Sequence, residues 1–382
     1  MLPLNVGCGA GDHAALEVAM PVEVIGMIGT QDESRRTGSM VHVSTASGVS
    51  PEFTAAFARA HEQAGFDQVL IGYRSTTADG FQVAGYAAGS TTRLRYLIAH
   101  RPGFMQPTLA ARAAATLDRF TGGRVALHII TGGSDADQQR DGDYADHDTR
   151  YRRSGEYMDV LRRIWTSEEP FDYEGDFYRF TSAFSQVKPL QQPHVPLYFG
   201  GASAPAIEVG AQYADVYALW GEPLEGVRER ISQIRTVAAS HGRKPQFHVS
   251  LRPIIAPTED EAWERARQIL ERVEAARPPS MVLAEASNEG SRRLLDFAAR
   301  SDVHDERLWM PLASATGAAG NTTALVGTPE QVADALAAYY DLGVEKILIR
   351  GFDPLPDAVE FGRELIPALR DRVAARDAAN NQ

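Results

Sequence analysis

The sequence predicts an α/β fold, a (β/α)₈ barrel with insertions, the architecture known as a TIM barrel. Eight short apolar runs alternate with amphipathic helical stretches over about 350 residues, which favours a barrel over a doubly wound sheet with a second domain. The 382 residues are 44% hydrophobic and 23% charged, enough to bury a core of that size. No shift in composition marks a domain boundary. We therefore expect a flexible leader over residues 1–20 and one barrel domain over residues 21–382.

Strands are expected where an apolar, β-branched run is too short for a helix. These runs cover residues 22–28, 68–73, 94–99, 125–130, 196–200, 216–220, 247–255 and 346–350. Helices are expected where apolar residues recur at helical spacing, and proline in the first turn marks three of their starts, at Pro51, Pro205 and Pro329. These stretches cover residues 51–64, 80–88, 107–120, 150–165, 204–213, 224–241, 259–276, 329–342 and 354–375.

Two segments are longer than the connections of a simple barrel. In the first, residues 167–189, the run Tyr-Glu-Gly-Asp-Phe-Tyr at 173–178 predicts a hairpin with a tight turn. The second, residues 277–321, is rich in Ser, Ala and Gly and follows the seventh strand on the face where barrel enzymes keep their active sites. Because loops of this length are usually lids or disordered linkers, we interpret it as a lid that closes over substrate.

Composition excludes several classes of function. The formal net charge is −12, and no segment combines basic and aromatic residues, so nucleic acid is not an expected partner. No apolar run approaches the 18–20 residues, roughly, that span a bilayer, and no signal peptide is evident, so we expect no membrane association. The single cysteine, Cys8, forms no internal disulfide and fits a cytoplasmic protein.

Two strand ends carry the small residues that an anion site needs. After the fourth strand come Thr131, Gly132, Gly133 and Ser134, and after the fifth strand the run 200–203, Gly-Gly-Ala-Ser, leads into a helix. Free N–H groups and the positive end of a helix dipole can receive a phosphate at such a turn, and a serine hydroxyl adds a further donor. The alternative is that Ser203 only caps the helix and the glycines only form a turn.

The acidic loop that follows does not predict a metal site. Asp141, Asp143, Asp146 and His147 lack the spacing of a calcium loop, and no second histidine lies near enough in the sequence for a usual zinc cluster. We expect no bound metal, and we interpret the loop as a solvated segment that shapes the entrance to the phosphate site.

In these motifs the chain resembles the bacterial luciferase-like flavin monooxygenases, and within them the alkanesulfonate monooxygenases that use reduced FMN. The resemblance covers about residues 22–375. It is carried by His100-Arg101-Pro102-Gly103, Pro107-Thr108-Leu109-Ala110-Ala111-Arg112, Ala115-Thr116-Leu117-Asp118, Thr131-Gly132-Gly133-Ser134-Asp135, Asp146-His147-Asp148, Arg150-Tyr151, Leu190-Gln191-Gln192-Pro193, Tyr198-Phe199-Gly200-Gly201-Ala202-Ser203 and Trp220-Gly221-Glu222-Pro223.

The resemblance implies a cofactor, its supply and part of its site. It implies FMN as FMNH₂, delivered by a separate NAD(P)H-dependent flavin reductase, with O₂ as the co-substrate. It also implies that the chain forms a homodimer or a homotetramer. It implies a phosphate site at Gly200, Gly201, Ala202 and Ser203. It also implies that Thr131 and Tyr151 reach the flavin and that a polar residue at the position of His128 contacts it near the ring. A histidine satisfied within the core is the alternative for His128.

Two further residues are candidates for catalysis. His100 lies at the C-terminal end of the third strand, a position that in a barrel favours the active site, where it could shuttle a proton or donate to the flavin. A structural histidine is the alternative. Trp220, at the end of the sixth strand, matches a family tryptophan that borders the substrate pocket, although a lone tryptophan is more often part of the core.

The departures from the family concern the substrate. The active-site cysteine of the simple alkanesulfonate enzymes is missing from residues 74–77, Arg-Ser-Thr-Thr, and Arg252 stands where they carry a histidine. After the eighth strand the chain has Arg350-Gly351-Phe352-Asp353 in place of Gly-Tyr-x-His. Two arginines at adjacent strand ends suit an oxyanion such as a sulfonate. Alternatively each pairs with a nearby acid, for example Arg350 with Asp353.

The resulting hypothesis is a two-component monooxygenase that cleaves the C–S bond of a small anionic organosulfonate to give an aldehyde and sulfite. The altered pocket favours a polar sulfonate such as a sulfosugar, which Gln31, Arg74 and His100 could hydrogen-bond. Two alternatives stay open. The chain is a luciferase-like flavin monooxygenase for an amine, amide, sulfone or ketone, or it is a flavin-binding barrel without catalysis.

Overall fold

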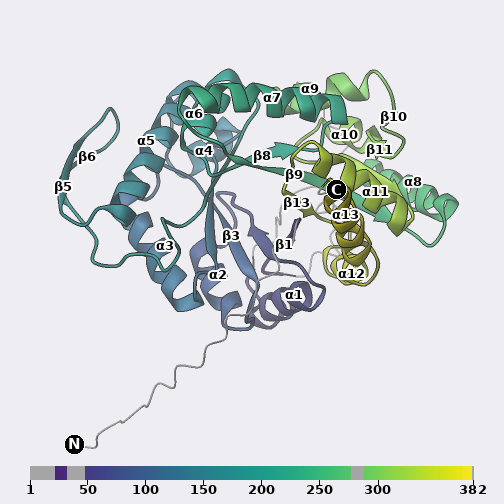
Figure 1. Ribbon diagram of the computed structural model, residues 1–382, viewed down its shortest axis with the longest axis horizontal. Helices are drawn as coiled ribbons and strands as arrows, with labels where there is room; N and C mark the ends of the chain where they lie inside the picture. Colours follow the sequence, from purple (N-terminus) through teal and green to yellow (C-terminus); the bar gives the residue numbers. More distant parts are fainter. Residues whose placement is uncertain (1–21, 32–47, 277–287, 381–382) are drawn as a thin grey trace, which may run out of the picture.

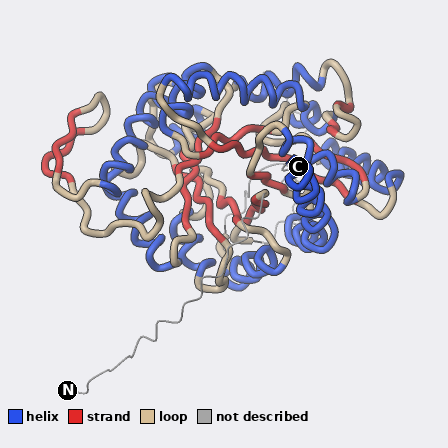
Figure 2. The backbone as a smooth tube through the Cα atoms, in the orientation of Figure 1, coloured by secondary structure: helices blue, strands red, loops and turns tan. Residues whose placement is uncertain are grey.

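The computed structural model describes residues 22–31, 48–276 and 288–380. The expected leader, residues 1–20, lies outside the described residues, as does the first part of the expected lid, residues 277–287. Eight strands form a central parallel barrel surrounded by helices (Figure 2). They are β1 (Glu23–Ile28), β2 (Gln68–Ile71), β3 (Arg95–His100), β4 (Val125–Ile129), β7 (Leu197–Gly200), β8 (Val216–Trp220), β9 (Gln246–Ile255) and β13 (Lys346–Ile349).

The barrel closes through β9. The strands pair in the order β9, β13, β1, β2, β3, β4, β7, β8, and β8 pairs again with β9, so no edge of the barrel sheet is left open. All these pairings are parallel, as the β–α alternation in the sequence predicts. The prediction of a (β/α)₈ barrel with insertions is confirmed, and each expected strand matches one of the barrel within a few residues.

Helices cover the outside of the barrel (Figure 1). They are α1 (Pro51–Gln63), α2 (Gly80–Ala88), α3 (Pro107–Thr121), α5 (His147–Thr166), α6 (Ala204–Tyr213), α7 (Leu224–Ser240), α8 (Glu259–Ala275), α11 (Pro329–Asp341), α12 (Pro354–Glu360), the π-helical turn η1 (Phe361–Leu365) and α13 (Ile366–Asn380). The starts of α1, α6 and α11 fall where proline predicted them. Helix α5 begins three residues before the expected start, because the Asp146 side chain accepts a hydrogen bond from Thr149 N at 2.9 Å and caps it.

Side chains of the barrel strands alternate between two cores. One set fills the interior of the barrel: Ile25, Leu97, Ala126, Tyr198, Val216 and Leu348, with Leu70 packed against them. Their neighbours along the same strands, such as Val24, Tyr96 and Leu127, belong to the larger core between strands and helices. Because strand side chains alternate with a period of two, this parity decides which later residues on each strand face the barrel axis.

Both expected insertions contain secondary structure. The first holds the antiparallel hairpin of β5 (Phe171–Glu174) and β6 (Arg179–Ala183), as predicted, and it projects from the helical layer at the left of Figure 1. The described part of the second contains elements that the sequence analysis did not assign: α9 (Glu289–Ala298), β10 (Val303–His304), β11 (Leu308–Trp309) and α10 (Pro311–Thr316). Strand β12 (Ala324–Gly327) follows and pairs in parallel with the last residues of β9.

Two further observations bear on the site and the surroundings of the protein. A short helix, α4 (Asp135–Arg140), follows β4 and begins at the cap residue Ser134. Across the described ranges, none of the helices combines the length and the apolar character needed to cross a membrane.

Candidate active site

A cavity of about 770 Å³ lies at the C-terminal ends of the barrel strands. Ten of the residues predicted to form the site line it: His128, Thr131, Tyr151, Gly200, Gly201, Ala202, Ser203, Trp220, Arg252 and Arg350. They come from β4, β7, β8, β9, β13 and α5, so the closure of the barrel is what brings them to one place. This is the face on which barrel enzymes carry their chemistry.

Two buried histidines form part of the cavity floor. His128 on β4 shares the parity of the interior residue Ala126, and His248 on β9 has the opposite parity to Val249 and Leu251 of the outer core. Their ring centres lie 6.4 Å and 6.3 Å from that of Tyr198. Burial lowers the pKa of His128 to about 4 and that of His248 to about 3, so both rings are neutral near pH 7. Three of their nitrogens, Nδ1 of His128 and both nitrogens of His248, are buried without a hydrogen-bond partner.

The turn between β7 and α6 forms an anion cradle, which we define as residues Gly200–Ser203. These residues line the cavity at the start of α6, and φ of Gly201 is +149°, a conformation that residues with a Cβ rarely adopt. A Cβ at Gly201 would lie 3.0 Å from the Tyr151 hydroxyl, so the cradle and that hydroxyl are in contact.

Ser203, within the cradle, and Tyr151, beside it, both line the cavity and carry hydroxyls. Burial raises the pKa of Tyr151, and the nearby Ser203 hydroxyl partly opposes the rise. Ser203 Oγ is buried, caps no helix N–H and has no hydrogen-bond partner at the geometry found. The alternative that Ser203 is a plain N-cap therefore lacks the hydrogen bond that defines one.

Arg252 and Arg350 line the cavity from the adjacent strands β9 and β13. Arg252 is 1% exposed; its Nη2 donates to the Gly351 carbonyl at 2.7 Å, and its guanidinium lies 3.7 Å from the centre of the Phe352 ring. Burial and the neighbouring charge of Arg350 lower the pKa of Arg252, but a guanidinium stays protonated at neutral pH. The acid suggested as a partner, Asp353, instead lies 3.8 Å from Arg272.

Trp220 and the start of α9 form one wall of the cavity. A Cβ at Gly290 would lie 2.9 Å from the Trp220 ring, so helix α9 packs directly on the indole. Arg293 of α9 donates two hydrogen bonds of 2.7 Å to the buried Glu222 carboxylate, which follows β8. The second insertion is thus attached to the barrel at the cavity by an ion pair.

The charges that line the cavity are mostly positive. Five arginines contribute to the lining: Arg74, Arg150, Arg230, Arg252 and Arg350. The three lining carboxylates are each held by an arginine: Asp135 by Arg150, Glu222 by Arg293 and Glu289 by Arg292. This excess of guanidinium groups favours anionic ligands.

Comparison with known proteins identifies the family. Residues 32–346 match the family described as luciferase-like monooxygenases, more than half of the chain. This chain belongs to the luciferase-like monooxygenase family. The family part of the resemblance is thereby confirmed, whereas the alkanesulfonate part stays a prediction.

Solved structures share the fold at low sequence identity. A riboflavin lyase with modified FMN and its substrate riboflavin has a TM-score of 0.74 at 20% identity, over 92% of this chain and 92% of that one. An EDTA monooxygenase from Chelativorans sp. BNC1 has a TM-score of 0.71 at 18% identity, over 92% and 94%. A secondary alcohol dehydrogenase dependent on coenzyme F420 has a TM-score of 0.65 at 17% identity, over 91% and 99%.

The lining of this luciferase-like cavity fits a flavin monophosphate. An FMN phosphate requires N–H donors, hydroxyl donors and positive charge at one end of the site, and the cradle provides the first two. The orphaned Ser203 Oγ and the close approach of Tyr151 to Gly201 are the specific observations. Thr131 also lines the cavity, and its contact with the flavin stays a prediction; its hydroxyl lies 3.3 Å from Ser154 Oγ, and its carbonyl accepts from Gln138 at 2.7 Å.

His100 does not line the cavity. Its strand position is as expected, but Leu97 faces the barrel interior, and the period of two turns His100 outward with Tyr96 and Ile98. Its Nε2 lies 2.6 Å from the Tyr157 hydroxyl of α5, and burial lowers its pKa to about 4. We therefore correct the expectation that His100 faces the mouth of the barrel, and we assign it a structural role.

Several lining residues were not singled out from the sequence. On β9, His248 and Ser250 precede Arg252 at intervals of two, and that alternation was a readable signal. Asn321 donates to Ser250 Oγ at 2.8 Å, and Arg230 reaches the cavity from α7. No sequence pattern pointed to these last two, since their place depends on how the elements pack. Of the residues proposed to bind a polar substrate, Arg74 lines the cavity, and Gln31 and His100 do not.

Proposed function

We propose that this protein is the oxygenase of a two-component system that uses FMNH₂ and O₂ to cleave the C–S bond of an organosulfonate. The products are an aldehyde, sulfite, oxidised FMN and water, so one oxygen atom enters the aldehyde and the other becomes water. The observation that carries the proposal is one cavity with an anion cradle at β7–α6 and two arginines, Arg252 within β9 and Arg350 directly after β13.

The cradle supports FMNH₂ as the cofactor. Gly200–Ser203 and Tyr151 would hold its phosphate through backbone and hydroxyl donors. When bound, the reduced flavin supplies the activation of O₂. No Gly-x-Gly-x-x-Gly fingerprint follows a strand in the sequence, so we assign NAD(P)H to a separate reductase.

The two arginines support an anionic substrate. A guanidinium presents parallel N–H donors that match two oxygens of a sulfonate. Ser250 and Asn321, which lie beside Arg252 on the lining, add neutral hydrogen-bonding groups suited to a hydroxylated substrate such as a sulfosugar. Trp220 provides an apolar surface against the carbon skeleton.

The remaining residues would exclude water and keep the floor uncharged. Helix α9 closes the side of the cavity next to Trp220. Met27, Leu70 and Leu348 line the cavity together with the two neutral histidines, so this part of the lining carries no charge. An apolar, enclosed site strengthens the pairing of an anion with those arginines.

A sulfite-release assay tests the proposal. The purified protein is combined with a flavin reductase, FMN and NADH and offered simple alkanesulfonates, sulfosugars, matched carboxylates and neutral ketones. We expect sulfite from at least one sulfonate and none without the reductase. Turnover of neutral substrates or carboxylates without sulfite from any sulfonate would replace the sulfonate assignment with the broader flavin monooxygenase function. Oxidation of NADPH by this chain alone would contradict the two-component arrangement.

A further inference from the structure

Arg230 is a buried cation that the proposed reaction does not yet use. It lies on α7, is 9% exposed and lines the cavity. Its Nη1 donates to Gln233 Oε1 at 2.9 Å, its Nε is buried without a partner, and among the described residues no carboxylate forms an ion pair with it. Buried guanidinium groups are normally paired with an anion, because burying an isolated charge is costly.

The charge of Arg230 lies next to the anion cradle. Arg230 and the cradle line the same cavity, and α7, which carries Arg230, packs against α6, which begins at the cradle. Burial raises the pKa of Tyr217, and the Arg230 charge opposes that rise. Tyr217 Oη donates to the Gly201 carbonyl at 2.8 Å, within the cradle. The Tyr151 hydroxyl also approaches Gly201, 3.0 Å from a Cβ placed there. Arg230, Tyr217 and Tyr151 therefore converge on the start of α6.

Arg150, the other arginine near the cradle, has its charge already engaged. Its Nη2 lies 2.8 Å from Asp135, and its Nη1 donates to the Ala145 carbonyl at 2.7 Å. The dipole and free N–H groups at the start of α6 correspond to roughly half a positive charge, and neutral hydroxyls add no net charge. A phosphate monoester carries nearly two negative charges at neutral pH, since its second pKa is about 6.

We propose that Arg230 recognises the terminal phosphate monoester of the flavin at the cradle and thereby makes the protein select FMN over a flavin without phosphate. This inference rests on the proposed use of FMNH₂. It assigns a specificity role to α7, an element outside the glycine-rich turn that forms the cradle itself.

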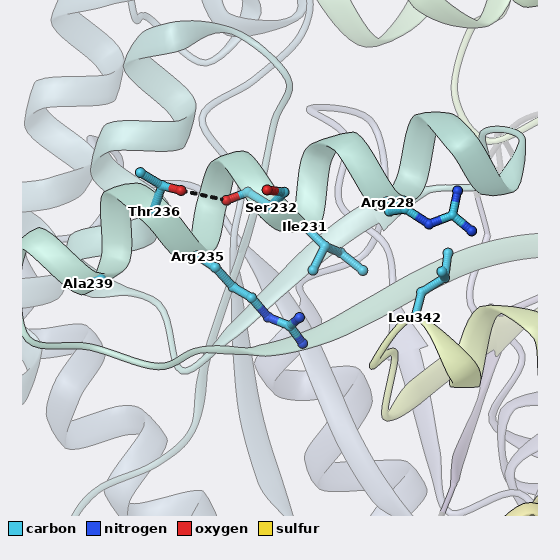
Figure 3. A pocket seen from close by; sticks show the side chains of 7 residues that line it. All are labelled: Arg228, Ile231, Ser232, Arg235, Thr236, Ala239 and Leu342. Atoms are coloured by element: carbon cyan, nitrogen blue, oxygen red, sulfur yellow. Dashed lines mark hydrogen bonds between the residues drawn. The ribbon is translucent and has the colours of Figure 1, made fainter.

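Anaerobic titrations of reduced FMN and reduced riboflavin test this role. The variants are Arg230→Gln, Arg230→Lys and the matched control Arg228→Gln. Arg228 is on the same helix but exposed, at the shallow surface depression of about 440 Å³ shown in Figure 3. We expect Arg230→Gln to weaken FMN binding by about 10- to 100-fold and to leave riboflavin binding within about twofold. The FMN affinity of Arg230→Lys should lie between those of Arg230→Gln and the wild type. Arg228→Gln should bind both flavins as the wild type does.

A second measurement uses the pH dependence of the same binding constants. The preference of the wild type for FMN should fall between pH 7.5 and 5.5, as the phosphate loses its second charge, and Arg230→Gln should show a smaller fall. Near-UV circular dichroism checks that each variant is folded.

The outcomes separate the two proposals. An equal loss of FMN and riboflavin binding in folded Arg230→Gln, or no loss of FMN binding, would overturn the role of Arg230 and leave the use of FMNH₂ intact. A wild-type protein that binds neither flavin would overturn the use of FMNH₂ itself, and the role of Arg230 with it.

Discussion

At the scale of single residues, Arg252 and Arg350 line the same cavity but differ in how far they are buried. Arg252 is held by the Gly351 carbonyl and the Phe352 ring and is 1% exposed, so its position is fixed before any substrate arrives. Arg350 is half-buried at the end of β13, on the same cavity. A fixed guanidinium loses little entropy when it binds an oxyanion, which is the advantage of such an arrangement.

Truncation of either arginine to alanine should lower kcat/KM for an anionic substrate roughly 30- to 800-fold. This corresponds to a loss of about 2–4 kcal/mol of transition-state stabilisation. Lysine should restore only part of this loss, because a point charge does not reproduce the bidentate fork. Flavin affinity should change little. Steady-state kinetics on matched anionic and neutral substrates check the prediction, and an equal loss on both would refute the anion clamp. Arg252→Ala also leaves the Gly351 carbonyl without its donor, so the fold of that variant is checked by circular dichroism.

The hydroxyls of the cradle give a second prediction. Ser203→Ala and Tyr151→Phe should each weaken binding of reduced FMN by about 1.5–3 kcal/mol, the range for a hydrogen bond to a charged group. The melting temperature should stay near that of the wild type, because the Ser203 side chain caps no N–H of α6 and Tyr151→Phe keeps the packed ring. Flavin titration measures the affinity, and calorimetry on the same samples measures the melting temperature. Unchanged affinity with a lower melting temperature would mean that the hydroxyls are structural.

At the scale of elements, α9 is attached to the barrel through one buried ion pair. Glu222 accepts two hydrogen bonds from Arg293, and these raise the pKa of the arginine. Glu229 also pairs with Arg293, at 3.1 Å, but its side chain is 64% exposed. The same arginine therefore has one buried and one solvated partner, which gives an internal comparison.

Arg293→Met should destabilise the protein by up to about 3–5 kcal/mol, because it leaves the Glu222 carboxylate buried without a counter-charge. Glu229→Gln should cost less than about 1 kcal/mol, as expected for an exposed pair. Urea unfolding of both variants measures the two values. Equal small effects would show that Glu222 is hydrated, and hydrogen exchange in α9 would then match the wild type.

At the scale of the whole molecule, buried histidines predict the response to acid. Burial lowers the pKa of His61, His100 and His128 from 6.5 to about 4, and that of His248 to about 3. The unfolded chain therefore binds more protons than the folded one between about pH 6.5 and 4. The free energy of unfolding should be highest above pH 6.5 and fall as the pH drops, by about 2 kcal/mol per histidine at pH 5.

Urea unfolding between pH 7.5 and 5 measures this loss. Carboxylates contribute mainly below about pH 4.5, so histidines dominate this window. His61→Asn removes one titrating ring and can keep a donor to the Phe57 carbonyl, which His61 Nδ1 contacts at 2.9 Å. The free energy of unfolding of this variant should fall less steeply as the pH drops. The difference in slope should correspond to about one fewer proton taken up on unfolding. A slope equal to that of the wild type would contradict the assignment.

The sequence alone determined the barrel and most of the cavity. Alternating short apolar runs and amphipathic helices leave few topologies open, and small residues at strand ends predict an anion site wherever the barrel closes. Gly200–Ser203, Arg252 and Arg350 were found from their positions at or near strand ends, because position on a strand is a local property that the chain displays directly, whereas Trp220 was identified through the family resemblance.

Only the tertiary structure decided orientation and distant contacts. His100 has the right position but the wrong parity, and strand alternation turns it toward Tyr157. Arg230 lines the cavity from α7, and α9 packs on Trp220 from a segment without a clear pattern in the sequence. Such contacts depend on how helices pack around the closed barrel, and that packing is set by many weak interactions between residues far apart in the chain, which local sequence patterns do not encode.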